Sequence, residues 1–195
     1  RIMSSILKVD QLQDSGGNEI ITSNGSGTIT VNNQTFKNGI VMIDNWRVTS
    51  SFTGNANPIA SNWERADNTI DLGKLGTGMT ESSGTFTFPQ TGIYYVIFMA
   101  SYNLNSNSRF SSNAIQTTLN NSTYSETAHS YTFISNNTSS TTYSSAITSQ
   151  TLNITDTANQ KVQFWVNHHD TNTTTSGNTN KDQTFVRFMR LGDAQ

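Results

Sequence analysis

Residues 84–102 read GTFTFPQTGIYYVIFMASY, and this stretch decides the fold. Phe86 and Phe88 alternate with threonines, which predicts a strand with one apolar face. Residues 89–92 predict a turn, because proline ends a hydrogen-bonded ladder and glycine accepts a positive φ. Residues 93–100 form an unbroken apolar run of β-branched and aromatic side chains. We interpret this run as a strand buried on both faces, in a sandwich or at a subunit interface, with a buried helix as the alternative.

The rest of the chain predicts more strands and no amphipathic helix. Gly-, Asn- and Ser-rich turn signals separate short apolar segments, and a long Asn/Thr-rich loop is expected at 168–181. About eight short strands with turns between them predict a sandwich or jelly roll. We expect a globular domain at 45–195, preceded by an extended β arm at 1–44. Beyond the opening stretch, we expect a strand to begin at 45–48. Further strands are expected at 113–120, 127–134, 143–154, 161–167 and 185–191.

The arm contains three apolar clusters between residues 3 and 33, separated by glycine-containing turns. Each cluster is too small to bury its own apolar surface, because an isolated hairpin is marginally stable in water. The arm is therefore expected to pack against the domain, sister chains or a larger particle, and a flexible linker is the alternative. We expect it to anchor the protein to other proteins through Ile6, Leu7, Val9, Ile20 and Ile21.

The composition argues against several partner classes. Only 12% of residues are charged, the net charge is −2, and lysines and arginines are scattered. Nucleic-acid binding needs a clustered basic patch, so it is not expected. Membrane insertion is not expected either, since no apolar run approaches about 20 residues. The absence of cysteine excludes disulfides and cysteine-based zinc sites and favours assembly in a reducing cytosol.

Candidate chemistry is sparse. His168, His169 and Asp170 are adjacent, but neighbouring residues on a strand point to opposite faces, so we expect a solvated loop. An ion held by His168 or His169 on a trimer axis stays open, and His129 is expected to be structural. No nucleophile elbow is present and the carboxylates cannot be paired from sequence, so neither enzyme activity nor a cofactor or metal is expected. Trp46 and Trp63 are expected in the core or at a subunit contact.

The opening stretch also carries a family resemblance. Phe86, Phe88, Pro89 and Gly92, followed by Tyr94 and Tyr95, resemble the central hairpin of complement C1q-like heads, which share a jelly roll with the tumour-necrosis-factor (TNF) family. Residues 184–188, TFVRF, resemble the closing strand of that family, which usually carries glycine where Arg187 stands. The resemblance covers about 45–192 and implies a C1q/TNF-like jelly roll and a homotrimer. The residues expected in the trimer interface or core are Phe86, Phe88, Tyr94, Tyr95, Phe98, Phe185 and Phe188.

A second resemblance lies in the arm. Residues 8–21, KVDQLQDSGGNEII, resemble N-terminal arms of tail-fibre-like proteins in marine bacteriophages. It implies a non-enzymatic virion protein, assembled in the host cytoplasm, whose arm binds other virion proteins. We therefore expect a trimeric fibre or knob that contacts a host-surface glycan or protein. Capsid decoration is one alternative, and a secreted C1q/TNF-like binding module is another.

Overall fold

The structure is a computed structural model and describes residues 11–27, 29–31, 39–68, 70–136 and 140–195. The chain divides into two compact units, Arg1–Gly39 and Ile40–Gln195. Every strand within the described residues pairs antiparallel with its neighbours, and these residues contain no helix.

The N-terminal unit contains a small sheet of the order β1-β2-β3. Its strands are β1 (Gln11–Gln13), β2 (Glu19–Ser23) and β3 (Ile29–Val31). The turn between β1 and β2 is organised by Asp14, whose carboxylate accepts hydrogen bonds from the backbone N–H groups of Gly16 and Asn18 at 2.8 and 2.9 Å. The Asn18 side chain also donates to this carboxylate, and these hydrogen bonds lower the pKa of Asp14. A short side-chain network therefore defines the turn.

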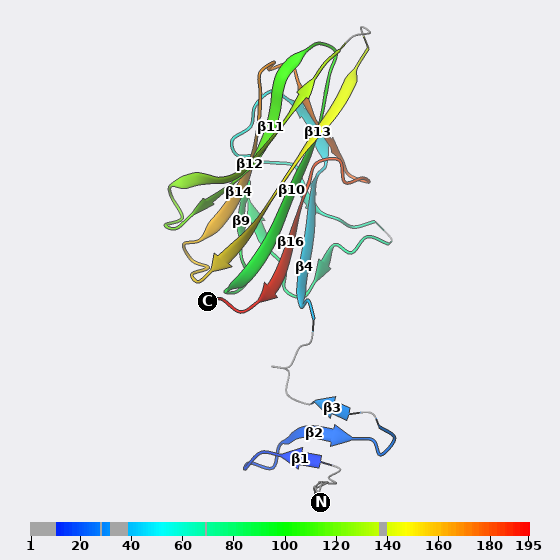
Figure 1. The fold of residues 1–195 in the computed structure, drawn as a ribbon, viewed down its shortest axis with the longest axis vertical. Helices are drawn as coiled ribbons and strands as arrows, with labels where there is room; N and C mark the ends of the chain where they lie inside the picture. Colours follow the sequence, from blue (N-terminus) through cyan, green and yellow to red (C-terminus); the bar gives the residue numbers. More distant parts are fainter. Residues whose placement is uncertain (1–10, 28, 32–38, 69, 137–139) are drawn as a thin grey trace, which may run out of the picture. The chain divides into compact units, whose positions relative to one another are not determined.

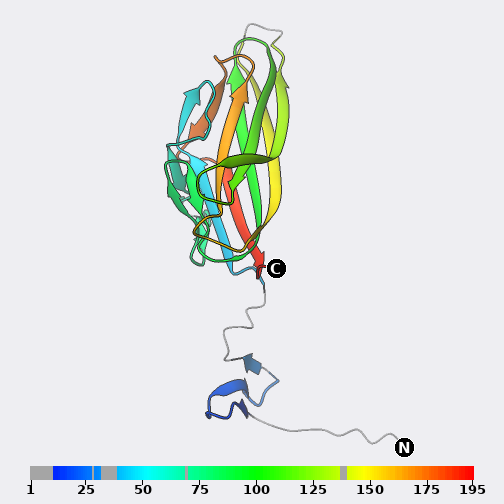
Figure 2. The same cartoon turned by 90° about the vertical axis from the view of Figure 1, so that its left-hand side faces the viewer.

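Two packed sheets form the second unit (Figures 1 and 2). The larger sheet has the order β5-β15-β10-β16-β4-β6, with β13 on the other edge of β10 and β7 on β4. The smaller sheet has the order β12-β11-β14-β9-β8. The strands are β4 (Met42–Val48), β5 (Ser50–Thr53), β6 (Trp63–Arg65), β7 (Lys74–Leu75), β8 (Thr80–Ser82), β9 (Thr85–Thr87), β10 (Gly92–Leu104), β11 (Ser108–Thr118), β12 (Tyr124–Ile134), β13 (Thr142–Ile154), β14 (Lys161–His168), β15 (Thr174–Asn178) and β16 (Phe185–Gly192).

The chain crosses between the two sheets repeatedly. β9 belongs to the smaller sheet, β10 to the larger, β11 and β12 to the smaller, β13 to the larger, β14 to the smaller, and β15 and β16 to the larger. Each crossing lets an apolar strand face bury against the opposite sheet. This alternation is the connectivity of a jelly roll, and the expected all-β jelly-roll class is confirmed.

The core lies between the sheets and is rich in aromatic rings. Phe86 on β9 contacts Trp63 and Phe164 edge-on, with ring centroids 5.4 Å apart in both pairs. Trp46 also packs edge-on against Phe86, at 5.6 Å. Such edge-to-face contacts stabilise beyond their buried area by about 0.5–1.5 kcal/mol each. Trp46 and Trp63 therefore pack against the core, as expected, and the Trp63 indole N–H donates to the carbonyl of Ile59 at 2.8 Å.

β10 alternates strictly between buried and half-buried residues over its whole length. Its even-numbered side chains, such as Tyr94, Val96 and Phe98, point into the core. The odd-numbered side chains point to the outer face of the larger sheet, where neighbouring strands cover them only in part. The prediction that residues 93–100 are buried on both faces is therefore wrong within a single chain.

Two expected boundaries also differ from the structure. β4 begins at Met42, three residues before the strand start expected at Asn45, because Met42 is buried in the core and Ile43 pairs with Met189 of β16. The expected loop at 168–181 contains β15, which pairs with β5 and with the end of β10. Thr175 is buried there, so this polar segment forms a strand of the larger sheet. Tertiary pairing has outweighed the weak strand signal of a Thr/Asn-rich segment.

Candidate functional site

The outer face of the larger sheet carries large apolar side chains. In the register of the sheet, Met99 of β10 lies between Ile147 of β13 and Phe185 of β16. Tyr95 lies beside Met189 of β16, which in turn pairs with Ile43 of β4. We call this surface the apolar outer face. Its residues are Ile43, Ile93, Tyr95, Ile97, Met99, Tyr143, Ile147, Phe185 and Met189.

The strand at the edge of this face is the most exposed part of it. Tyr143 is 74% exposed and Ile147 is 60% exposed on β13. Contiguous apolar surface on a soluble protein marks an interaction site, because each exposed apolar side chain gains free energy when a partner covers it. This face of the sheet therefore suits a contact with another protein. It does not have the concave shape of a substrate pocket.

The seven residues predicted for the trimer interface or core lie in two places. Five of them are inside the sandwich with at most 2% of their surface exposed: Phe86, Phe88, Tyr94, Phe98 and Phe188. The other two, Tyr95 and Phe185, are half-buried on the apolar outer face. Arg187, which stands where the resembling family has glycine, points outward with its guanidinium 4.7 Å above the Phe185 ring, so the closing strand packs without a glycine there.

The residues predicted for the arm's anchor are only partly visible. Ile6, Leu7 and Val9 lie outside the described residues. Ile20 and Ile21 lie on β2, where both are half-buried within the small sheet. Their role as an anchor stays a prediction.

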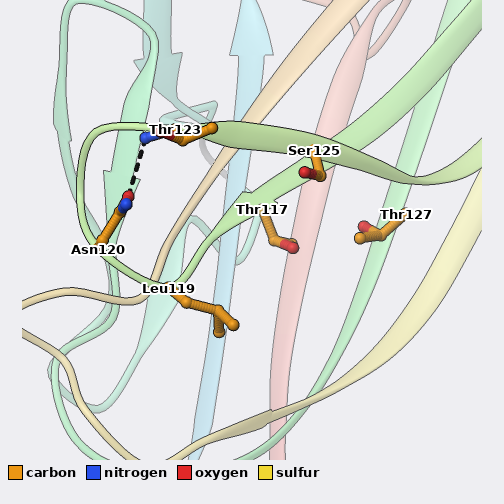
Figure 3. Close-up of a pocket in the computed structure, with 6 residues that line it drawn as sticks. All are labelled: Thr117, Leu119, Asn120, Thr123, Ser125 and Thr127. Carbon is orange, nitrogen blue, oxygen red and sulfur yellow. Dashed lines mark hydrogen bonds between the residues drawn. The ribbon is translucent and has the colours of Figure 1, made fainter.

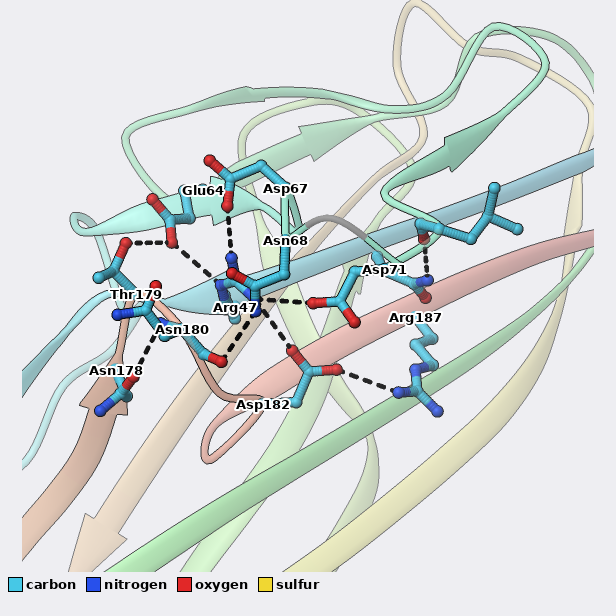
Figure 4. Close-up of polar contacts among 12 residues, drawn as sticks. Arg47, Glu64, Asp67, Asn68, Asp71, Asn178, Thr179, Asn180, Asp182 and Arg187 are labelled. Carbon is cyan, nitrogen blue, oxygen red and sulfur yellow. Dashed lines mark hydrogen bonds and ion pairs between the residues drawn. The ribbon is translucent and has the colours of Figure 1, made fainter.

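A charged cluster lies at one border of the apolar outer face (Figure 4). Arg47, which pairs with Phe185 across β4 and β16, has a fully buried side chain. Its guanidinium binds Glu64 at 3.0 Å and Asp67 at 2.6 Å. Asp71 follows at 3.3 Å, and Asp182 lies at 3.8 Å and also pairs with Arg187. The four carboxylates exceed the two arginines, so the cluster is acidic when all six groups are ionised.

The electrostatics of this cluster keep Arg47 charged. Burial disfavours the charged guanidinium, but hydrogen bonds and charge from Glu64, with contributions from Asp71 and Asp67, outweigh it and raise the pKa of Arg47. Removing one partner of such a buried charge is costly, because the remaining charge is left without solvent. The cluster therefore fixes the loops after β6 and β15 against β4 and gives the apolar outer face a polar border, as interfaces commonly have.

His168 and His169 point to opposite sides of the smaller sheet. His168 ends β14 with only 3% of its surface exposed, and its ring lies edge-on to Tyr102 at 4.9 Å. The expectation of a solvated loop is thus wrong for His168, because the strand alternation continues one residue further and turns this side chain inward. Burial lowers the pKa of His168 to about 4. His169 is exposed and packs against Phe110.

The described part of the chain lacks the features of two other site classes. Within it, no three His, Asp or Glu side chains group in a way that could hold a metal ion. These residues also include no helix with the length and hydropathy needed to cross a membrane. A shallow groove of about 310 Å³ lies beside the β11–β12 hairpin and is lined by hydroxyls, one amide and Leu119 (Figure 3). Asn120 is committed there to the turn, since its amide oxygen accepts from the backbone N–H of Thr123 at 2.8 Å.

Comparison with solved structures places this architecture. The Eiger TNF from S. frugiperda superposes with a TM-score of 0.57 at 14% identity, covering 80% of this chain and 95% of that one. Murine APRIL at pH 8.5 gives a TM-score of 0.53 at 9% identity, covering 77% and 98%. Murine APRIL at pH 5.0 gives 0.53 at 11% identity with the same coverage. The fold is a TNF-like jelly roll.

The likeness to these TNF-like structures concerns the fold alone, since the identities are this low. No protein-family model and no curated protein sequence matches the chain. The pairing of the strands explains why the sequence alone did not place Ile147 on the apolar outer face. Ile147 stands among serines and threonines, and only the register beside Met99 reveals that it extends an apolar surface. Its one sequence signal was the alternation of residues 143–154.

Proposed function

We propose that this chain is a non-enzymatic virion structural protein of a phage, whose jelly-roll head assembles into homotrimers and contacts the host surface. The apolar outer face carries the proposal. It combines half-buried Tyr95 and Met99 with strongly exposed Ile147, on a strand pair that runs the length of the head. Each chain gains free energy by covering this face, at about 25 cal/mol per Å² of apolar surface removed from water.

The charged border supports an interface with copies of the same chain. Obligate interfaces bury about 2,000 Å² or more in total and have an apolar centre inside a polar rim. The Arg47 cluster provides such a rim next to Phe185. Closed symmetry lets each chain contribute the same surfaces and leaves no apolar face uncovered. Three copies are favoured by the C1q/TNF resemblance of residues 86–95.

The N-terminal unit supports a role on a larger particle. Its three short strands form a compact unit of their own, and half-buried Ile20 and Ile21 are its central apolar residues. A sheet this small is marginally stable alone, so a partner surface would stabilise it. Together with the tail-fibre-like sequence of residues 8–21, this favours attachment to other virion proteins. Whether the head forms a fibre tip or decorates a capsid depends on the partner of this unit.

The second candidate is a secreted binding module. It is favoured by the structural likeness to an Eiger TNF and to APRIL, which extends over nearly the whole length of those chains. The two candidates share the trimeric head and differ in where the protein is found. Antibodies raised against residues 40–195 should label intact phage particles in electron micrographs if the virion role holds. Particles that carry the gene but no label would exclude that role.

The trimer itself is tested by native mass spectrometry of the purified protein, which should report three chains. Ile147→Asp places a charge in the apolar outer face and should shift the population to monomers that keep their circular dichroism spectrum. The matched control is Leu119→Asp, which changes an even more exposed side chain (78%) on the β11–β12 hairpin of the smaller sheet and should leave three chains. A wild-type protein that stays monomeric at micromolar concentration contradicts the proposal.

A further inference from the structure

A second exposed surface lies on the other side of the sandwich, on the outer face of the smaller sheet. Strands β12, β11 and β14 are neighbours there (Figure 1). Ring-bearing side chains gather across them, and we call this surface the aromatic patch. Its residues are Phe110, His129, Tyr131, Phe133, Trp165 and His169.

The register of the strands explains why the rings meet. Ala114 of β11 lies between His129 of β12 and Trp165 of β14. The small alanine lets these two rings contact above it, edge-on at 5.0 Å. His129 also stacks on Tyr131, with centroids 4.1 Å apart and planes only 17° apart. A bulge in β12 brings Glu126 within 2.8 Å of the His129 Nδ1, which orients the imidazole. The platform is therefore ordered before any ligand arrives.

The aromatic patch is open to solvent on one side. Tyr131 is 66% exposed and Phe133 is 67% exposed, although both are large apolar rings. Phe110 lies beside Tyr131 at 6.2 Å and continues the surface toward His169. Alternation along β12 puts Tyr131 and Phe133 on the same face, since Ile134 between the sheets is buried. Tyr131 packs against His129 and Phe110, yet about two-thirds of its surface stays open to solvent, as does that of Phe133.

A polar side chain that can hydrogen-bond a ligand accompanies the rings. Ser112 lies between Tyr131 and Asn167 in the register, so Asn167 stands two strands away from the exposed ring, about 10 Å across the sheet. Within the described residues, the side-chain amide of Asn167 has no hydrogen-bond partner. The amide of Gln116, farther along β11, is buried and committed, since it donates to Asn57 at 2.8 Å and to Gln163 at 2.9 Å. The surface thus joins flat apolar rings to the free side-chain amide of Asn167.

We propose that the aromatic patch binds neutral pyranose sugars of a glycan chain. One face of a pyranose ring exposes C–H groups with partial positive charge, which complement the negative face of an aromatic ring. The hydroxyls at the ring edge need neutral donors and acceptors, and the free Asn167 amide offers both. Two linked pyranoses span the distance from Tyr131 to Asn167. The proposal names the ligand class for the host-attachment role proposed above and rests on it.

The size and charge of the patch argue against other ligands. An aromatic side chain has about 150–250 Å² of surface, so Tyr131 and Phe133, each about two-thirds exposed, together offer roughly 200–330 Å². A stable protein contact takes about 800 Å² from each partner. Nucleic acids require clustered cations, and the patch residues include none with a permanent positive charge. The patch also lies on the sheet opposite the apolar outer face, so a trimer would display three copies and gain avidity for a glycan with repeated units.

The test is saturation-transfer-difference NMR on the full-length protein with maltose, cellobiose, lactose and mannobiose as probes. At least one disaccharide should receive saturation at its ring C–H protons, whereas sorbitol, which has the hydroxyls but no ring face, should not. Tyr131→Ala and Phe133→Ala should each raise the dissociation constant of the disaccharide by at least about fivefold, since a ring contact contributes about 1 kcal/mol to binding. The matched control Leu119→Ala removes an exposed apolar side chain near the tip of the same hairpin and should change nothing.

Two results overturn the proposal: no saturation transfer to any of the four disaccharides, or an undiminished signal in the Tyr131→Ala/Phe133→Ala double variant. A double variant that changes its oligomeric state would also overturn it, because the patch would then be a contact between proteins. Native mass spectra of the same samples show whether the protein is trimeric. A single disaccharide binds one patch in a monomer or a trimer, so a failure of sugar binding is distinguished from a failure of the trimer.

Discussion

At the scale of single residues, Gly92 shows how close packing constrains the start of β10. Its φ of 158° is positive, as expected, but lies close to extended backbone, so space and not a left-handed turn requires the glycine. A Cβ at this position would lie 2.7 Å from the carbonyl oxygen of Gly192 and 2.5 Å from Nε of Arg190. The Arg190 side chain can move, whereas the backbone carbonyl is held by the sheet.

Gly92→Ala should therefore destabilise the head by roughly 1–3 kcal/mol, the usual cost of overpacking. Gly192→Ala is the matched control, since a Cβ at Gly192 meets no atom within 4 Å, and it should change the free energy of unfolding by less than about 0.5 kcal/mol. Urea denaturation of both variants measures the difference. Equal effects of the two substitutions would contradict the assignment of Gly92 to a close backbone approach.

His168 predicts a pH dependence of stability. Its pKa is lowered to about 4 in the folded protein by burial, whereas the unfolded chain titrates near the ordinary value of 6.5. Between these values the unfolded state binds more protons than the folded state. The stability that the protein has with His168 neutral is therefore intact above pH 6.5 and is lost as the pH falls toward 4. The loss amounts to about 3 kcal/mol at most.

The measurement is the free energy of unfolding at pH 7.5 and pH 4.5 for the wild type and for His168→Phe, which keeps a ring against Tyr102 but cannot be protonated. The variant should lose less stability than the wild type on acidification, by about 2 kcal/mol. His169→Phe, at the exposed neighbouring position, should retain the wild-type dependence. If His168→Phe retains it as well, the buried imidazole is not the group that responds.

At the scale of elements, Asn113 connects the two sheets through the core. It lies on β11 of the smaller sheet and is fully buried. Its side-chain amide donates to the carbonyl oxygen of Phe98 on β10 and to that of Ala146 on β13, both at 3.0 Å. β10 and β13 are partners in the larger sheet, so one side chain ties three strands together across the sandwich.

Asn113→Ala should cost about 2–3 kcal/mol, because two buried hydrogen bonds are lost and the space they occupied is left empty. Ser111→Ala on the same strand is the control: within the described residues the buried Ser111 hydroxyl has no partner, so its removal should be neutral or slightly stabilising. Thermal unfolding followed by circular dichroism compares them. A larger loss for Ser111→Ala than for Asn113→Ala would contradict the role of Asn113.

At the scale of the whole molecule, the head should fold without the N-terminal unit. All residues of the buried core lie between Met42 and Phe188. Deleting residues 1–39 should therefore shift the thermal midpoint of the head by no more than about 4 °C, which corresponds to about 1 kcal/mol for a domain of this size. Differential scanning calorimetry measures this shift.

The same deletion tests the anchor. The truncated head should still form trimers but should no longer be incorporated into particles when it is expressed in infected cells, because Ile6, Leu7, Val9, Ile20 and Ile21 are gone. Incorporation of the truncated head would place the anchor in the head itself. An unfolded truncation product would instead make the first 39 residues part of the domain.

Most of the fold could be predicted from local patterns in the sequence. Strict alternation and the turn around Pro89 identified β9 and β10 as strands, and their aromatic residues pointed to a jelly roll. The two strands do not form the expected hairpin, because the turn passes the chain from the smaller sheet to the larger one. Alternation was equally sufficient for β14, where Val162, Phe164 and Val166 face the core. These features are local because one strand's periodicity already states which of its faces is apolar.

Surfaces were decided only by the tertiary structure. An apolar residue at a half-buried position looks the same in sequence as one in the core, so Tyr95 could not be separated from Tyr94 until the pleat direction of β10 was known. The aromatic patch was invisible for a different reason: His129 and Trp165 are 36 positions apart in sequence and meet only because β12 and β14 flank β11. Periodicity describes one strand at a time, whereas a surface depends on the order and register of several strands, which only long-range pairing determines.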